Sequence, residues 1–239
     1  MTSEFTGFRP QAVDFLVELG LNNERAWFQP RKAEYEALLK VPLEQLCGAL
    51  DEAFRARGIP LSADPARSPF RIYRDVRFSK DKSPYKTNVG ASFAWAGDGA
   101  TGATGGFGGY FHLEPGGTFV GGGMWHPEPA RLAAWRAMVV GERERVHAAV
   151  EDPAFRSTFG AVEGDRLIRV PAGYAADDPD ADLLRLKDVV FSRRLGDDEI
   201  YASDLPLTLA EALAGAVPLL GLLASLPGGD EGGGRRGRR

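Results

Sequence analysis

Basic and aromatic side chains that could bind an anion are concentrated in one stretch, residues 71–88. The stretch carries six cations and two aspartates, a local charge of 6 − 2 = +4, whereas the whole chain has a formal net charge of −4. Guanidinium groups bind phosphate or carboxylate through paired hydrogen bonds, and lysines add point charge. A cationic segment in an acidic protein therefore predicts a local site for a negatively charged group. The candidate ligand-binding residues are Arg71, Tyr73, Arg74, Asp75, Arg77, Lys80, Lys82, Tyr85 and Lys86.

The same stretch alternates as a half-buried strand does, and this predicts a strand over residues 70–78. The side chains expected to face the core are Phe70, Ile72, Val76 and Phe78. Arg74 falls on this apolar face, where an arginine is costly unless it is paired. We therefore expect Arg74 to be substantially buried and paired with a carboxylate or several carbonyls. The two tyrosines, Tyr73 and Tyr85, would supply a stacking or hydrogen-bonding surface, and Asp75 would orient an arginine.

Two of the three histidines occur as His-x-Glu, namely His112 with Glu114 and His126 with Glu128. On a strand, His112 and Glu114 share a face, so they are the best acid–base candidates if the ligand is a substrate. The alternative is that His112 only forms a hydrogen bond within the sheet. Glu128 begins a predicted helix, where a carboxylate interacts favourably with the helix dipole. We predict no metal site and no cofactor.

Several familiar motifs are absent or misleading. The glycine-rich stretch Gly97–Gly109 contains a literal G-x-G-x-x-G, but it runs into more glycines and a strand rather than opening a helix, so it does not predict dinucleotide binding. This loop could instead act as a lid. The only cysteine, Cys47, lies in an apolar helical pattern and is expected to be a buried structural thiol.

The hydrophobic periodicity predicts an α+β protein. Helical spacing dominates residues 10–57, where Asn22 or Asn23 could cap a helix and Pro42 divides the pattern. Alternating strands follow in an antiparallel meander, at about residues 70–78, 89–95, 110–113 and 118–120. Later segments are mostly helical, with further short strands expected at 167–170 and 189–191, and the C-terminal helices are expected to pack on the sheet.

Residues 1–226 are expected to form a single domain, followed by a disordered Gly/Arg-rich tail at 227–239. The stretch 205–226 is apolar enough to approach a membrane span, but Pro218 favours a core helix broken near that residue over a tail anchor. No secretory signal is visible at the start, so a soluble, cytoplasmic protein is predicted.

At these motifs the chain resembles the bacterial and fungal domain-of-unknown-function family twenty-four sixty-one. The matching stretches are 22–28, 71–87, 109–117, 121–127 and 183–188. The resemblance covers about residues 8–226 and brings no established activity. It implies a stand-alone cytoplasmic protein.

Together these features predict a protein that binds a phosphate-bearing or other anionic small molecule at the basic hairpin, with enzymatic activity left open. One alternative is a nucleic-acid binding module that uses the same cations and aromatic rings. Another is an interaction protein whose hairpin docks an acidic partner. A small-molecule site requires a concave pocket, whereas nucleic acid requires an open basic track. The sequence leaves the oligomeric state open.

Overall fold

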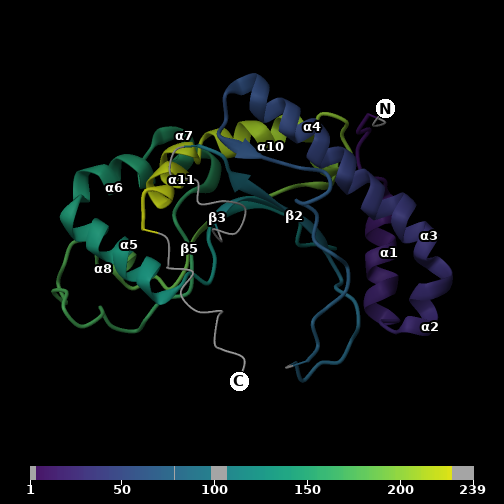
Figure 1. The fold of residues 1–239 in the computed structure, drawn as a ribbon, viewed down its shortest axis with the longest axis horizontal. Coiled ribbons are helices and arrows are strands. Elements are labelled where there is room, and N and C mark those ends of the chain that lie inside the picture. Colours follow the sequence, from purple (N-terminus) through teal and green to yellow (C-terminus); the bar gives the residue numbers. More distant parts are fainter. Residues whose placement is uncertain (1–3, 78, 98–106, 228–239) are drawn as a thin grey trace, which may run out of the picture.

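The computed structural model describes residues 4–77, 79–97 and 107–227, and within these ranges the chain has the predicted α+β architecture (Figure 1). The N-terminal helical elements are α1 (Pro10–Leu21), α2 (Arg25–Phe28), η1 (Gln29–Arg31), α3 (Lys32–Tyr35), η2 (Glu36–Lys40) and α4 (Val41–Arg57). The strands are β1 (Leu61–Ser62), β2 (Val89–Trp95), β3 (Phe107–Leu113), β4 (Phe119–Met124) and β5 (Val189–Arg194). The later helices are α5 (Pro129–Gly141), α6 (Arg143–Val150), α7 (Pro153–Phe159), α8 (Ala181–Leu184), α9 (Asp197–Ile200), α10 (Leu205–Ala214) and α11 (Val217–Ala224).

The five strands form one antiparallel sheet in the order β1-β2-β3-β4-β5. Side chains alternate between its two faces, as the pleat of a strand requires. On β3, Phe111 and Leu113 are fully buried, whereas Tyr110 and His112 point to the opposite, partly exposed face. The sheet therefore has a core face and an open face.

Helices cover the core face, as Figure 1 shows for α4, α10 and α11. Gly109 of β3 lies so close to Leu213 of α10 that a Cβ would approach its side chain to 3.0 Å. One hydrophobic cluster joins buried residues from Phe5 to Leu226, so the N-terminal and C-terminal helices share the core of the sheet. Removing this much apolar surface from water is the main favourable term in folding.

The apolar C-terminal stretch forms two core helices rather than one long one. Helices α10 and α11 meet at an angle of 61° around Gly215 and Ala216, and Pro218 lies in the first turn of α11. The predicted break near Pro218 is thus confirmed, because proline is accepted in the first turn of a helix but not in its interior. Among the described residues no single helix is long and apolar enough to span a membrane, although this bent pair meets the length and composition test when taken together.

The basic stretch does not form the regular strand that was predicted over residues 70–78. It is an irregular hairpin, residues 70–88, that extends from the edge of the sheet before β2 begins. Its two arms are joined by a bridge between Tyr73 and Tyr85 and by backbone hydrogen bonds from Arg74 to Pro84 and from Lys86 to Ile72. Pro84 has no N–H to donate, so the ladder cannot continue regularly through it.

Consequently the expected core face of this stretch is only partly correct. Ile72 is buried, Val76 is half-buried and Phe70 is 45% exposed, while Phe78 lies outside the described residues. The predicted strand at 167–170 is also wrong, since this segment is irregular and only isolated bridges flank it.

Two further expectations fall largely outside the described residues. One is the prediction that the glycine-rich loop 97–109 could act as a lid, because residues 98–106 of this loop are not described. The other is the predicted disordered tail at 227–239, because only Pro227 of these residues is described.

Candidate functional site

An open pocket lies between the basic hairpin and the open face of the sheet. Its volume is about 480 Å³. The hairpin supplies one wall and strand β3 supplies the other. The lining residues are Phe70, Arg74, Asp75, Lys86, Asn88, Tyr110 and His112. Three predicted ligand-binding residues and one predicted acid–base residue therefore meet at the same place, although the sequence separates them by up to 38 positions (112 − 74 = 38).

Strand β3 presents a chain of three polar side chains on the open face. The hydroxyl of Tyr110 lies 3.0 Å from Nδ1 of His112, and Nε2 of His112 lies 3.1 Å from Oε2 of Glu114. With neutral imidazole, Nε2–H donates to the carboxylate, and the tyrosine hydroxyl donates to Nδ1. This continuous pair of hydrogen bonds gives a path along which a proton can move between the pocket and Glu114.

Tyr110 was not predicted as part of the site. The signal was present, because residues two apart on a strand share a face and Tyr110 precedes His112 by two. Burial, assisted by the negative charge of Glu114, raises the pKa of Tyr110, so this side chain is held in its neutral, proton-donating form. The imidazole is fixed from behind by Phe119 of β4, whose ring stacks on it with a centroid separation of 4.8 Å.

Space for the tyrosine is provided by a glycine in the neighbouring strand. Gly90 of β2 pairs with His112 in the sheet register. A Cβ at Gly90 would lie 2.7 Å from the Tyr110 hydroxyl and 2.8 Å from the carbonyl oxygen of Phe111. Both separations are shorter than any normal carbon–oxygen contact, so only glycine fits here without displacing the tyrosine.

Two arginines of the hairpin form ion pairs with the aspartates of the same hairpin. Arg74 is half-buried and forms an ion pair with Asp81, which confirms that it is paired but shows less burial than expected. Arg77 is paired with Asp75 through two hydrogen bonds, from Nε at 2.9 Å and from Nη2 at 2.6 Å. The hydrogen bonds from Arg77 and Arg74 hold the pKa values of Asp75 and Asp81, respectively, below their usual range. Asp75 thus orients an arginine, but that arginine is 77% exposed and does not line the pocket.

Lys86 differs from Arg74 and Arg77 because it forms no ion pair with a carboxylate of the described residues. Its ammonium lies 5.2 Å from the centroid of the Phe70 ring, and that ring lies 6.0 Å from the ring of Tyr110. Partial burial, and secondarily the nearby charge of Arg71, lowers the pKa of Lys86. Lys86 of the hairpin therefore lines the same pocket as Tyr110 and His112 of β3.

The remaining predicted ligand-binding residues are not among those that line the pocket. Arg71, Tyr73 and Lys80 are exposed on the hairpin. Lys82 donates to the carbonyl oxygen of Val76 at 2.9 Å. Tyr85 is only 1% exposed and stacks on Phe28 at 4.1 Å, so it is part of the core and is not accessible to a ligand.

Asn23 anchors the hairpin to the N-terminal helices. Its side-chain oxygen accepts from the backbone N–H of Tyr85, and its amide donates to the carbonyl of the same residue, both at 3.0 Å. The expectation that Asn22 or Asn23 caps the next helix is therefore wrong. The N-cap residue of α2 is Glu24, and the Asn23 amide pairs with the backbone as a neighbouring strand would.

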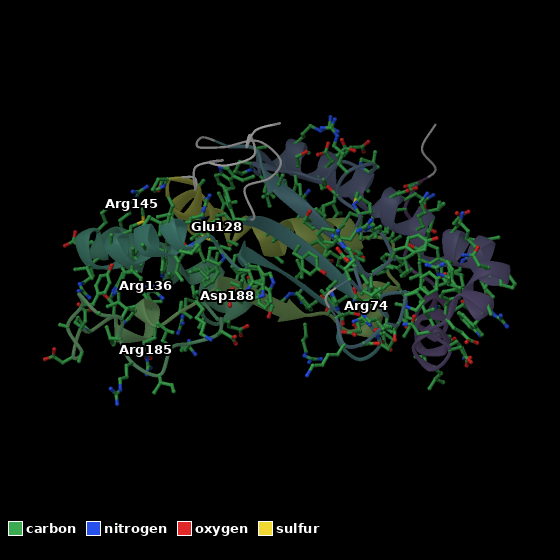
Figure 2. The ribbon with its side chains drawn as sticks, turned by 60° about the horizontal axis from the view of Figure 1, so that its bottom comes forward. Arg74, Glu128, Arg136, Arg145, Arg185 and Asp188 are labelled. Atoms are coloured by element: carbon green, nitrogen blue, oxygen red, sulfur yellow. The ribbon has the colours of Figure 1, made fainter. Side chains whose placement is uncertain are left out.

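A second polar cluster lies away from the pocket, where the chain leaves β4 and returns to β5. Asp188 is 2% exposed, and its Oδ1 accepts from the backbone N–H of His126 at 2.7 Å. His126 has a positive φ of 46°, an unusual conformation for a residue with a side chain. Figure 2 shows Asp188 and Arg74 on separate parts of the molecule. We interpret this cluster as the support of a sharp turn.

The described residues contain no group of three or more His, Cys, Asp or Glu side chains placed to hold a metal ion. The polar chain on β3 supplies only one imidazole and one carboxylate. The pocket combines cationic side chains, which suit an anionic ligand, with the hydrogen-bonded pair Tyr110 and His112, which suits proton transfer.

Comparison with known protein families identifies a match over most of the chain. A family model described as "Conserved hypothetical protein (DUF2461)" matches residues 11–221, which include the hairpin, all five strands and the pocket. No curated protein and no solved structure matches the chain.

Proposed function

We propose a function from the geometry of the site, because the chain belongs to the DUF2461 family and the description of that family states no activity. The protein binds a small anionic molecule in the pocket between the hairpin and β3, and it transfers protons to or from that molecule. The observation that carries this proposal is the meeting of cations and a Tyr110–His112–Glu114 proton chain in one pocket.

The charges around the pocket favour an anion. Lys86 has no carboxylate partner among the described residues, and its pKa is lowered first by partial burial and then by the positive charge of Arg71 nearby. A bound phosphate or carboxylate would relieve this repulsion and would replace water around both groups. Arg74 retains guanidinium N–H groups that Asp81 does not use, and these can donate to the same anion.

The alternative of a nucleic-acid surface is less well supported. Binding along a strand depends on several cations that are available to successive phosphates. Here Arg74 and Arg77 are engaged by aspartates of the same hairpin, and Lys82 is engaged by a carbonyl. Lys86, which has no carboxylate partner among the described residues, lines a pocket, and this geometry suits one small ligand. The same pairing weakens the case for docking an acidic protein.

Binding is tested by calorimetric titration of the full chain with inorganic phosphate, pyrophosphate and a single-stranded oligonucleotide. We expect Lys86→Gln to weaken phosphate or pyrophosphate binding roughly 10- to 100-fold, since a charge-assisted hydrogen bond contributes about 1.5–3 kcal/mol. Lys80→Gln is the matched control, because Lys80 belongs to the same hairpin but does not line the pocket.

Three results would contradict the proposal. The first is equal loss of binding in Lys80→Gln and Lys86→Gln, and the second is the absence of any phosphate or pyrophosphate binding. Tight oligonucleotide binding that falls with each hairpin cation removed would favour the nucleic-acid alternative.

A further inference from the structure

Lys86 is placed as a nucleophile as well as a cation. Among the described residues no carboxylate pairs with it, its ammonium lies against the ring of Phe70, and it shares a pocket with a proton-transfer chain. A lysine becomes nucleophilic when an apolar or cationic neighbourhood disfavours its ammonium form. Partial burial of Lys86 and the neighbouring positive charge of Arg71 both act in this direction.

We propose that Lys86 forms a Schiff base with the carbonyl group of an aldehyde or ketone that also carries a phosphate or carboxylate. This inference rests on the proposed function, because Arg74 would hold the anionic group while the carbonyl reaches Lys86. It names the ligand class more narrowly as anionic carbonyl compounds.

The reaction balances without an oxidant or a metal. The ammonium releases one proton to the Tyr110–His112 chain, and the neutral amine then attacks the carbonyl carbon. The C–N bond forms as the C–O π electrons move to oxygen, which regains that proton from the chain. A second proton from nitrogen follows, and the oxygen leaves as water while nitrogen and carbon form the iminium double bond. The ammonium and the carbonyl compound thus give an iminium ion and water.

Two neighbouring groups make this step feasible in the pocket. Tyr110 is held neutral and hydrogen-bonded to Nδ1 of His112, so a proton can pass along the chain in either direction. Other lysines of the hairpin lack this setting. Lys80 does not line the pocket, and the Lys82 ammonium donates to a backbone carbonyl.

The inference is tested with glycolaldehyde phosphate, and with 2-hydroxyethyl phosphate as a probe that lacks the carbonyl. The full-length protein is incubated with each probe and reduced with borohydride, and the modified lysines are mapped by mass spectrometry of peptides. We expect the aldehyde to modify Lys86 at least tenfold faster than Lys80, and we expect no modification by the alcohol. Excess 2-hydroxyethyl phosphate should slow the modification by competing for the pocket.

Lys86→Arg separates charge from nucleophilicity, because arginine keeps the cation but forms no comparable imine. This variant should lose the selective adduct, whereas Lys80→Arg, a change outside the pocket, should keep the adduct and should bind 2-hydroxyethyl phosphate within about threefold of wild type. Equal modification of Lys80 and Lys86, or a selective adduct elsewhere that survives in Lys86→Arg, overturns the inference. If wild type binds the alcohol but forms no adduct, only the Schiff base fails. If it binds neither probe, the anion site itself fails.

Discussion

Asn23 provides the most direct test of how the hairpin is positioned. Its side chain makes two hydrogen bonds to the backbone of Tyr85, so Asn23→Ala leaves one N–H and one C=O without these partners. Each such bond contributes a net 0.5–1.5 kcal/mol, which predicts a loss of about 1–3 kcal/mol. If the hairpin unfolds with the rest of the chain, the midpoint temperature falls by roughly 2–12 °C, at about 2–4 °C per kcal/mol.

Asn22→Ala is the matched control. The Asn22 amide donates to the carbonyl of Glu18 within the same helical turn, and the contact is exposed. The predicted cost is therefore less than about 1 kcal/mol.

Hydrogen exchange distinguishes local opening from global unfolding. The amides of Arg74 and Lys86 keep their own partners in Asn23→Ala, so their exchange reports hairpin opening. A loss of 1–3 kcal/mol confined to the hairpin speeds this exchange roughly 5- to 150-fold. Unchanged exchange and an unchanged melting temperature in Asn23→Ala would refute the anchoring role, and so would an equal effect of Asn22→Ala.

Two further predictions concern the sheet and the alkaline limit of stability. Gly90→Ala should displace Tyr110 and lower the free energy of unfolding, measured in urea, by about 1–3 kcal/mol. Gly20→Ala is the control and should be neutral or stabilising, because a Cβ at this helical position meets only an ordinary contact at 3.7 Å. Equal effects of the two substitutions would contradict the prediction. Burial raises the pKa values of Tyr35 and Cys47 to about 12, so both groups ionise first in the unfolded chain. The free energy of unfolding should not depend on these two groups below about pH 9. Between pH 9 and pH 12 it should fall by up to about 1.4 kcal/mol per pH unit for each group, and this fall should be less steep in Tyr35→Phe.

The fold class followed from the sequence because periodicity changes sharply along the chain. Helical spacing before residue 58 and alternation after residue 89 each reflect burial of one face, which is a local property. The hairpin was misinterpreted because its alternating pattern resembles that of a strand. Pro84 and the internal pairing of Arg74 with Asp81 keep it irregular.

The site was only partly predictable for a related reason. His112 and Glu114 share a strand face, so their pairing is encoded by spacing alone, and the same spacing could have identified Tyr110. The meeting of this strand with Lys86 depends on how the hairpin folds over the sheet. The Asn23 anchor likewise joins residues 62 positions apart, and no local pattern contains that information.

The contact between Asp188 and His126 has a consequence for the order of folding. Strands β1 to β4 follow one another along the sheet, but 64 residues, 125–188, separate β4 from β5. The Asp188–His126 hydrogen bond closes a loop of 62 residues at its base. The length-dependent entropy of closing such a loop is about 3.7 kcal/mol, which must be offset before β5 gains its contacts. We therefore expect β5 to join the sheet last, after helices α5 to α8 have shortened the effective length of the intervening chain.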